Sequence, residues 1–183
     1  DRDRGTLPPQ RKSSRQESEE VMIVYEARKF AEEHHEGLTD IYGHPAISHI
    51  ERVVERVLHA PHGVPLYLYL KHLRPQPRRW RTRETVAVAY LHDIVEDTSV
   101  TVDDVSSMFG ELIGSAVAAI TRCSETYADY IYRLKASPCP YKTPSSSSIA
   151  VTVKRADLLD HLEGPTPCPT SLVKRYEKAL TAL

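Results

Sequence analysis

The stretch AYLHDIVEDT, residues 89–98, restricts the possible folds more than any other part of the chain. Its helical pattern places one imidazole and three carboxylates within six residues, at His92, Asp93, Glu96 and Asp97. Side chains four residues apart lie above one another on a helix, so His92 aligns with Glu96. Asp93 aligns with Asp97 in the adjacent row. Burying these groups is costly unless a positive charge lies among them, so the stretch predicts a divalent metal ion such as manganese, iron or zinc.

A tight metal site needs further ligands from elsewhere in the fold, and two residues are suitable by their position. His49 lies one turn before Val53, near the edge of the buried face of an amphipathic helix predicted over residues 46–59. Asp157 lies in VTVKRADLLDHL, among the apolar residues of another predicted helix. Both side chains are therefore candidates to complete the site.

The hydrophobic periodicity predicts an all-α domain, because we find no convincing strand and no internal repeat. The helical patterns cover residues 21–37, 46–59, 84–97, 102–110, 111–122, 126–134, 149–164 and 171–183. Thr101 and Asp104 have the spacing of a capping box at the start of the fourth of these helices. The segment SPCPYKTPSSSS, residues 137–148, is predicted to be a loop.

Two segments do not show the periodicity of a folded element. Residues 1–20 contain five acidic and five basic residues and almost no apolar ones, so we expect a flexible tail before a single domain over residues 21–183. Residues 60–83 form an irregular insertion, and KHLRPQPRRWRTR, residues 71–83, has six Lys or Arg and no acid. That basic segment is either a solvated loop or a lid that attracts phosphate.

Composition excludes several classes of protein. With 24 basic and 25 acidic residues, the chain lacks the basic excess of a dedicated nucleic-acid binder. Its three cysteines are scattered and odd in number, which indicates neither a disulfide framework nor a cysteine zinc site. No apolar run reaches the length of a membrane span. We therefore expect a cytoplasmic protein without a membrane partner, and its oligomeric state is left open.

Three segments, in order along the chain, carry a resemblance to a known family. YLHDIVEDT resembles the central motif of the HD-domain metal-dependent phosphohydrolases, in particular the hydrolase domain of the RelA/SpoT group and its small single-domain relatives that hydrolyse alarmones. HEGLTDIYGHPAISHIERV resembles the family segment H-x-G-Q … G-x-P-Y-I-x-H-P, and VKRADLLDHL resembles V-K-x-A-D-x-x-x-N. The resemblance implies a compact HD-domain helical bundle around one metal site.

The resemblance also assigns roles to individual residues. It implies that the metal, most commonly Mn²⁺, has four ligands: His49, His92, Asp93 and Asp157. It implies that Glu96 and Asp97 orient the attacking water and handle protons, and that Lys154 binds a phosphate oxygen. His44 precedes the Pro of the family's Gly-x-Pro and is therefore not the ligand histidine.

Four departures from the family pattern concern the substrate. Asp40 stands where the family has a basic residue that contacts the guanine ring, and His161 stands where an Asn contacts the nucleotide sugar. We keep both as substrate-binding positions, although a basic-to-acidic exchange near an anionic nucleotide is not neutral. Ala46 and Ile50 replace the Tyr and the Pro of the second motif.

These observations favour an enzyme that hydrolyses a phosphorylated small-molecule nucleotide, most specifically a guanosine 3′-pyrophosphate such as (p)ppGpp. Another nucleotide, such as NADPH or a nucleoside phosphate, is the alternative within the class. A non-catalytic module that binds a nucleotide is the alternative outside it. The remaining histidines have less specific explanations: His34 and His35, at a helix end, are expected to be exposed or to cap the helix.

Overall fold

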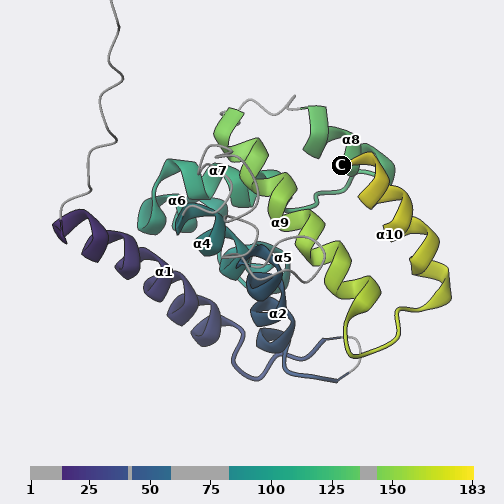
Figure 1. The fold of residues 1–183 in the computed structure, drawn as a ribbon, viewed down its shortest axis with the longest axis horizontal. Helices are drawn as coiled ribbons and strands as arrows, with labels where there is room; N and C mark the ends of the chain where they lie inside the picture. Colours follow the sequence, from purple (N-terminus) through teal and green to yellow (C-terminus); the bar gives the residue numbers. More distant parts are fainter. Residues whose placement is uncertain (1–13, 41–42, 59–82, 137–143) are drawn as a thin grey trace, which may run out of the picture.

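Two helices, α4 (Arg83–Leu91) and α9 (Pro144–Glu163), lie at the centre of a computed structural model that describes residues 14–40, 43–58, 83–136 and 144–183. Helix α4 packs against α1, α2, α7 and α9, and α9 packs against α2, α4, α7, α8 and α10 (Figure 1). The small side chains of Ala87 and Ala89 are fully buried, which lets neighbouring helices approach α4 from several sides. A helix that is apolar all round is stable only in such a core.

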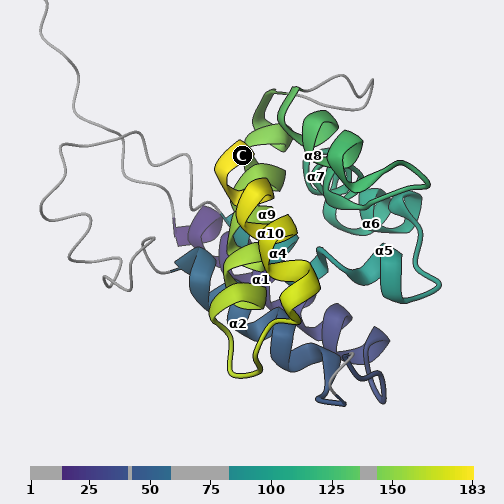
Figure 2. The ribbon, with the colours of Figure 1, turned by 90° about the vertical axis from the view of Figure 1, so that its right-hand side faces the viewer.

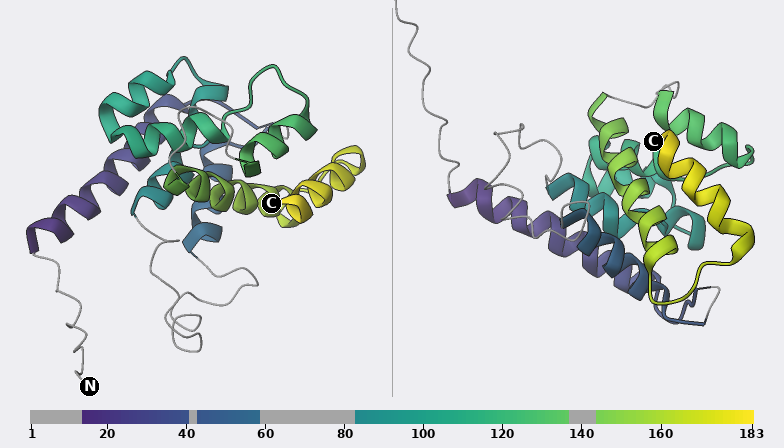
Figure 3. Two further views of the ribbon diagram at one scale, coloured as in Figure 1. Left: turned by 90° about the horizontal axis from the view of Figure 1, so that it is seen from above. Right: turned by 45° about the vertical axis from the view of Figure 1, so that its right-hand side comes forward.

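The outer helices each bury one apolar face against this centre. Helix α1 (Ser14–His34) runs along α4, and α2 (Ala46–Leu58) packs on α4 and α9 through a stripe that includes Ile50 and Val53. Helix α10 (Thr170–Ala182) lies alongside α9, as Figures 2 and 3 show.

Four shorter helices form the other side of the bundle. They are α5 (Ile94–Asp97), α6 (Val102–Phe109), α7 (Glu111–Ile120) and α8 (Tyr127–Ala136). Helices α6 and α7 approach closely at Gly114, where an added Cβ atom would lie 2.9 Å from the Cα atom of Ser106. Only glycine fits there without moving the backbone of α6.

The predicted fold class is confirmed. Among the described residues the structure contains helices and no strand, apart from an isolated bridge between Thr39 and Pro45. The capping box is also confirmed: the Thr101 hydroxyl accepts from the Asp104 N–H, and the Asp104 carboxylate accepts from the Thr101 N–H.

Three predicted boundaries were wrong. Helix α1 begins at Ser14 rather than at residue 21, in a stretch rich in glutamate, which is a good helix former. The serines at 145–148 belong to α9 rather than to a loop, and the full burial of Ser146 shows that packing outweighs local propensity there. The helix predicted over 84–97 is interrupted between α4 and α5, at His92 and Asp93.

Some predictions concern residues outside the described ranges. These are residues 1–13 of the polar tail and residues 60–82 of the basic insertion. Among the helices that are described, none is both long and apolar enough to cross a membrane.

Candidate metal centre

The interruption between α4 and α5 directs the His92 ring into the core. Its Nδ1 atom lies 2.9 Å from the carbonyl oxygen of Ala89, one turn earlier, so Nδ1–H donates to that oxygen. Donation from Nδ1 leaves Nε2 as the atom that faces the centre of the bundle. Asp93 follows at the start of α5, and its Oδ2 atom lies 3.0 Å from Nε2 of His92. A regular helix would have stacked His92 on Glu96, so the interruption changes the predicted row of side chains.

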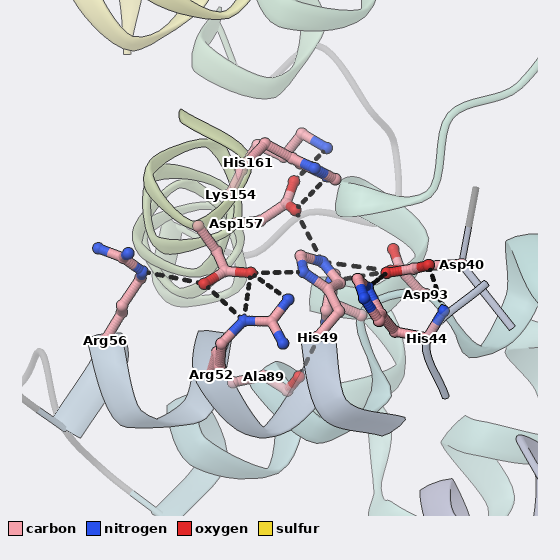
Figure 4. A network of polar contacts seen from close by, with 12 residues as sticks. Asp40, His44, His49, Arg52, Arg56, Ala89, Asp93, Lys154, Asp157 and His161 are labelled. Atoms are coloured by element: carbon pink, nitrogen blue, oxygen red, sulfur yellow. Dashed lines mark hydrogen bonds and ion pairs between the residues drawn. The ribbon is translucent and has the colours of Figure 1, made fainter. Parts of the chain in front are cut away.

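His49 and Asp157 reach the same place from α2 and α9. Nε2 of His49 lies 3.1 Å from Oδ1 of Asp157 and 3.8 Å from Oδ2 of Asp93. Both residues are buried, with 9% and 2% of their surface exposed. Two helices and the turn between α4 and α5 therefore bring the four predicted ligands together. Figure 4 shows three of them, His49, Asp93 and Asp157, pointing toward one another.

The geometry of this cluster fits a metal ion. One ligand atom each from His49, His92 and Asp157 lies within 4.8 Å of the others. The Nε2 atoms of both histidines are buried, and neither makes a hydrogen bond of good geometry with the carboxylate oxygens beside it. Buried polar atoms without a well-formed hydrogen bond are uncommon and call for an explanation. Two imidazole nitrogens and carboxylate oxygens around one point are a donor set that first-row divalent ions accept.

The charges of the cluster compensate one another when no ion is present. Burial alone would lower the pKa of His49, but its contacts with Asp157, Asp160 and Asp93 outweigh burial and raise that pKa to about 10. Burial likewise opposes ionisation of Asp93, yet the adjacent charge of His92 lowers the pKa of Asp93 to about 2. The positive charge favoured on the His49 ring thus offsets the negative charge of the carboxylates around it.

Lys154 also compensates charge at this cluster. Its ammonium lies 2.7 Å from Oδ2 of Asp157, one turn along α9, and 5.5 Å from the centre of the Tyr130 ring. The charge of Asp157 raises the pKa of Lys154 well above its usual value, against the effect of burial. The charge of Lys154 is therefore already paired with that of Asp157.

Glu96 and Asp97 lie on the exposed side of the cluster. Oε1 of Glu96 accepts a hydrogen bond of 2.7 Å from the backbone N–H of Arg122, just after α7, which fixes its position. Partial burial raises the pKa of Glu96 despite this bond, and partial burial together with the charge of Asp93 raises the pKa of Asp97. Both carboxyl groups therefore hold a proton more readily than freely solvated ones.

Of the two predicted substrate positions, His161 contacts the cluster, whereas Asp40 contacts His44 within its own turn. The His161 ring stacks on that of His49, with centroids 4.8 Å apart, and its Nε2 atom lies 3.2 Å from Oδ1 of Asp157. Asp40 instead caps its own turn, where its carboxylate accepts from the backbone N–H of His44. His44 pairs with Asp40, and it is not among the three described residues, His49, His92 and Asp157, whose ligand atoms converge.

The sequence analysis missed one carboxylate beside this cluster. Asp160 is buried on α9 and contacts His49, Arg52 and Arg56. The signal for it was its spacing of three residues from Asp157, which places both on neighbouring rows of one helix. Of the two expectations for His35, exposed or cap-forming, the structure has the second: the side chain is 2% exposed, and its Nδ1–H donates to the Ala31 carbonyl in the last turn of α1.

Comparison with known proteins finds a similarity in structure. No family model and no curated protein sequence matches the chain. Among solved structures, the chain is similar to a metazoan orthologue of SpoT that hydrolyses ppGpp and plays a role in starvation responses. The identity is 18%, the TM-score is 0.56, and the match covers 95% of this chain and 85% of that one. A similarity at this level shows a shared all-α fold.

Proposed function

We propose that this chain is an HD-type metal-dependent phosphohydrolase acting on a nucleotide, most specifically on the 3′-pyrophosphate of (p)ppGpp. The observation that carries the proposal is the convergence of His49, His92 and Asp157, with ligand atoms within 4.8 Å of one another. The exposed carboxylates beside them, and the fold shared with a ppGpp hydrolase, support the same proposal.

In this proposal the ligands are His49, His92, Asp93 and Asp157, and the ion is Mn²⁺ or another first-row divalent metal. Such an ion supplies a Lewis acid that polarises phosphate oxygens and lowers the pKa of water. Glu96, held by the Arg122 N–H, accepts the proton of the attacking water, and Asp97 holds that water in line. Lys154 neutralises charge at Asp157 until a phosphate oxygen competes for its ammonium.

The identity of the nucleotide depends on two residues. Asp40 carries a negative charge at the position that the alarmone pattern assigns to a base, and His161 offers a flat ring instead of an amide. These differences keep a second substrate class in consideration, namely another phosphorylated nucleotide such as NADPH or a nucleoside phosphate. Retention of both Glu96 and Asp97 argues against a module that only binds, since binding does not need a pair of carboxylates that activate water.

Phosphate and pyrophosphate release from a nucleotide panel tests this proposal. The panel contains ppGpp, NADPH and nucleoside phosphates, each assayed with Mn²⁺ and with EDTA, and Asp93→Ala is the inactive control. We expect pyrophosphate release from ppGpp that requires Mn²⁺ and is lost in the control. Release from another member of the panel would identify that nucleotide as the substrate and leave the assignment as a phosphohydrolase unchanged. No release from any member, by protein that binds Mn²⁺, contradicts catalysis and supports the binding module.

A further inference from the structure

We infer that Asp160 is a positioning residue, which holds the His49 ring with its Nε2 atom toward the proposed metal. This inference rests on the metal site of the proposed function and adds to it a residue that does not touch the ion. Oδ2 of Asp160 lies 2.9 Å from Nδ1 of His49. Asp160 is 3% exposed, so it is part of the core.

The contact determines which nitrogen of His49 is available. An ionised carboxylate only accepts hydrogen bonds, so Nδ1 of His49 must carry a hydrogen. The Nε2 atom then faces the opposite way, toward Oδ1 of Asp157 at 3.1 Å. An imidazole coordinates a metal through the nitrogen that lacks a hydrogen, and a carboxylate partner also makes that nitrogen more basic.

Two arginines hold the Asp160 carboxylate in this orientation. Nε of Arg52 lies 3.1 and 3.0 Å from its two oxygens, and Nε of Arg56 lies 3.3 Å from Oδ1. Both arginines follow His49 on α2, whereas Asp160 and Asp157 share α9. One carboxylate therefore fixes a ligand of α2 relative to a ligand of α9.

His92 shows that this arrangement is specific to His49. The Nδ1 atom of His92 donates to the backbone carbonyl of Ala89, which is neutral and lies in the helix just before His92. Asp160 is ionised, buried and held by two cations, and burying a carboxylate costs several kcal/mol before its partners compensate. If Asp160 served only to join α2 to α9 through the two arginines, it would not need to contact the His49 ring.

The full chain with Asp160→Asn tests the inference, because the amide keeps the shape but has only one acceptor oxygen for His49, Arg52 and Arg56. Glu163→Gln is the matched control, since it removes a carboxylate 2.9 Å from the same Arg56 without touching His49. Arg52→Gln is a second variant at a side chain that is 31% exposed, so it tests the same carboxylate with less risk to folding. Mn²⁺ affinity is measured by competition with a chelator, and unfolding of the metal-free proteins is measured in parallel.

We expect Asp160→Asn to weaken Mn²⁺ binding about 10- to 100-fold, the usual effect of losing a partner of a metal ligand. Arg52→Gln should weaken it less, and Glu163→Gln should leave it unchanged. In the protein saturated with Zn²⁺, the NMR resonance of the His49 Nδ1 proton should lie far downfield and move upfield in Asp160→Asn. A role in helix packing alone would lower the unfolding temperature without moving this resonance.

Unchanged Mn²⁺ affinity in a folded Asp160→Asn protein overturns the inference, and so does a failure of the wild type to bind Mn²⁺. A different outcome would contradict the proposed catalysis and leave the inference about Asp160 intact. If the wild type binds Mn²⁺ and hydrolyses no nucleotide, while Asp160→Asn binds Mn²⁺ less tightly, the positioning role stands and the hydrolase assignment falls.

Discussion

Oδ1 of Asp157 lies 3.1 Å from Nε2 of His49, and its other oxygen lies 2.7 Å from the ammonium of Lys154. One buried carboxylate thus joins a proposed ligand on α2 to a cation on its own helix. We predict that Asp157→Asn abolishes metal-dependent activity and weakens Mn²⁺ binding by more than about 100-fold, exceeding the usual effect of a residue outside the ligand set. Metal content after gel filtration and the nucleotide assay check this prediction.

The same substitution has a second consequence that does not depend on metal. Removing one partner of a buried ion pair costs about 3–5 kcal/mol, because Lys154 would be left without its carboxylate. Urea unfolding in EDTA should show a loss of this order for Asp157→Asn. Asp103→Asn, at an exposed aspartate on α6, should show almost none. Equal stability of the two variants would contradict the pairing of Lys154 with Asp157.

Glu96→Gln separates catalysis from metal binding. The amide oxygen can still accept from the Arg122 N–H, so the side chain keeps its position but loses its ability to accept a proton. We predict a fall in kcat of about 10²- to 10⁴-fold, the usual contribution of a general base, with unchanged Mn²⁺ affinity. Glu33→Gln, an exposed glutamate on α1, serves as the control. A loss of Mn²⁺ affinity in Glu96→Gln would instead make this residue a ligand.

The parts of this molecule that depend on local pattern were predictable. Apolar periodicity gave the all-α class, and the spacing of Thr101 and Asp104 gave a capping box that the structure contains. The parts that depend on backbone geometry were not. A helical pattern continues through His92 and Asp93, and nothing local shows that the chain turns there to aim both side chains inward.

Asp160 and His35 show a second limit. Local pattern does not show that an aspartate or a histidine among polar neighbours is buried, because its burial depends on the helices that pack around it. Asp160 is stabilised in the core by Arg52 and Arg56 of α2, so its environment appears only when α2 and α9 are packed together. Burial of a charged group depends on its partners, and a single sequence does not reveal which partners meet.

The metal-free chain should lose stability at alkaline pH. The folded-state pKa of His49 is about 10, above its ordinary value of 6.5, because Asp157, Asp160 and Asp93 favour the protonated ring. A raised pKa in the folded state gives stability that is fully present below pH 6.5 and is lost as pH rises through about 10. Thermal unfolding in EDTA between pH 6 and about pH 10 measures this loss of stability. His49→Gln should show a smaller decline, and identical profiles for both proteins would contradict the prediction.

The capping box at the start of α6 offers a test of the fold away from the proposed metal site. The Thr101 hydroxyl accepts from the Asp104 N–H, one of the N–H groups that a helix start leaves without an intrahelical partner. We predict that Thr101→Ala lowers the free energy of unfolding by about 1 kcal/mol and leaves Mn²⁺ affinity and kcat unchanged. Thr101→Ser keeps the hydroxyl and should retain most of the stability, as judged from urea unfolding. If Thr101→Ala reduced kcat as well, α6 would have to contribute to the position of the neighbouring helix α5, which carries Glu96 and Asp97.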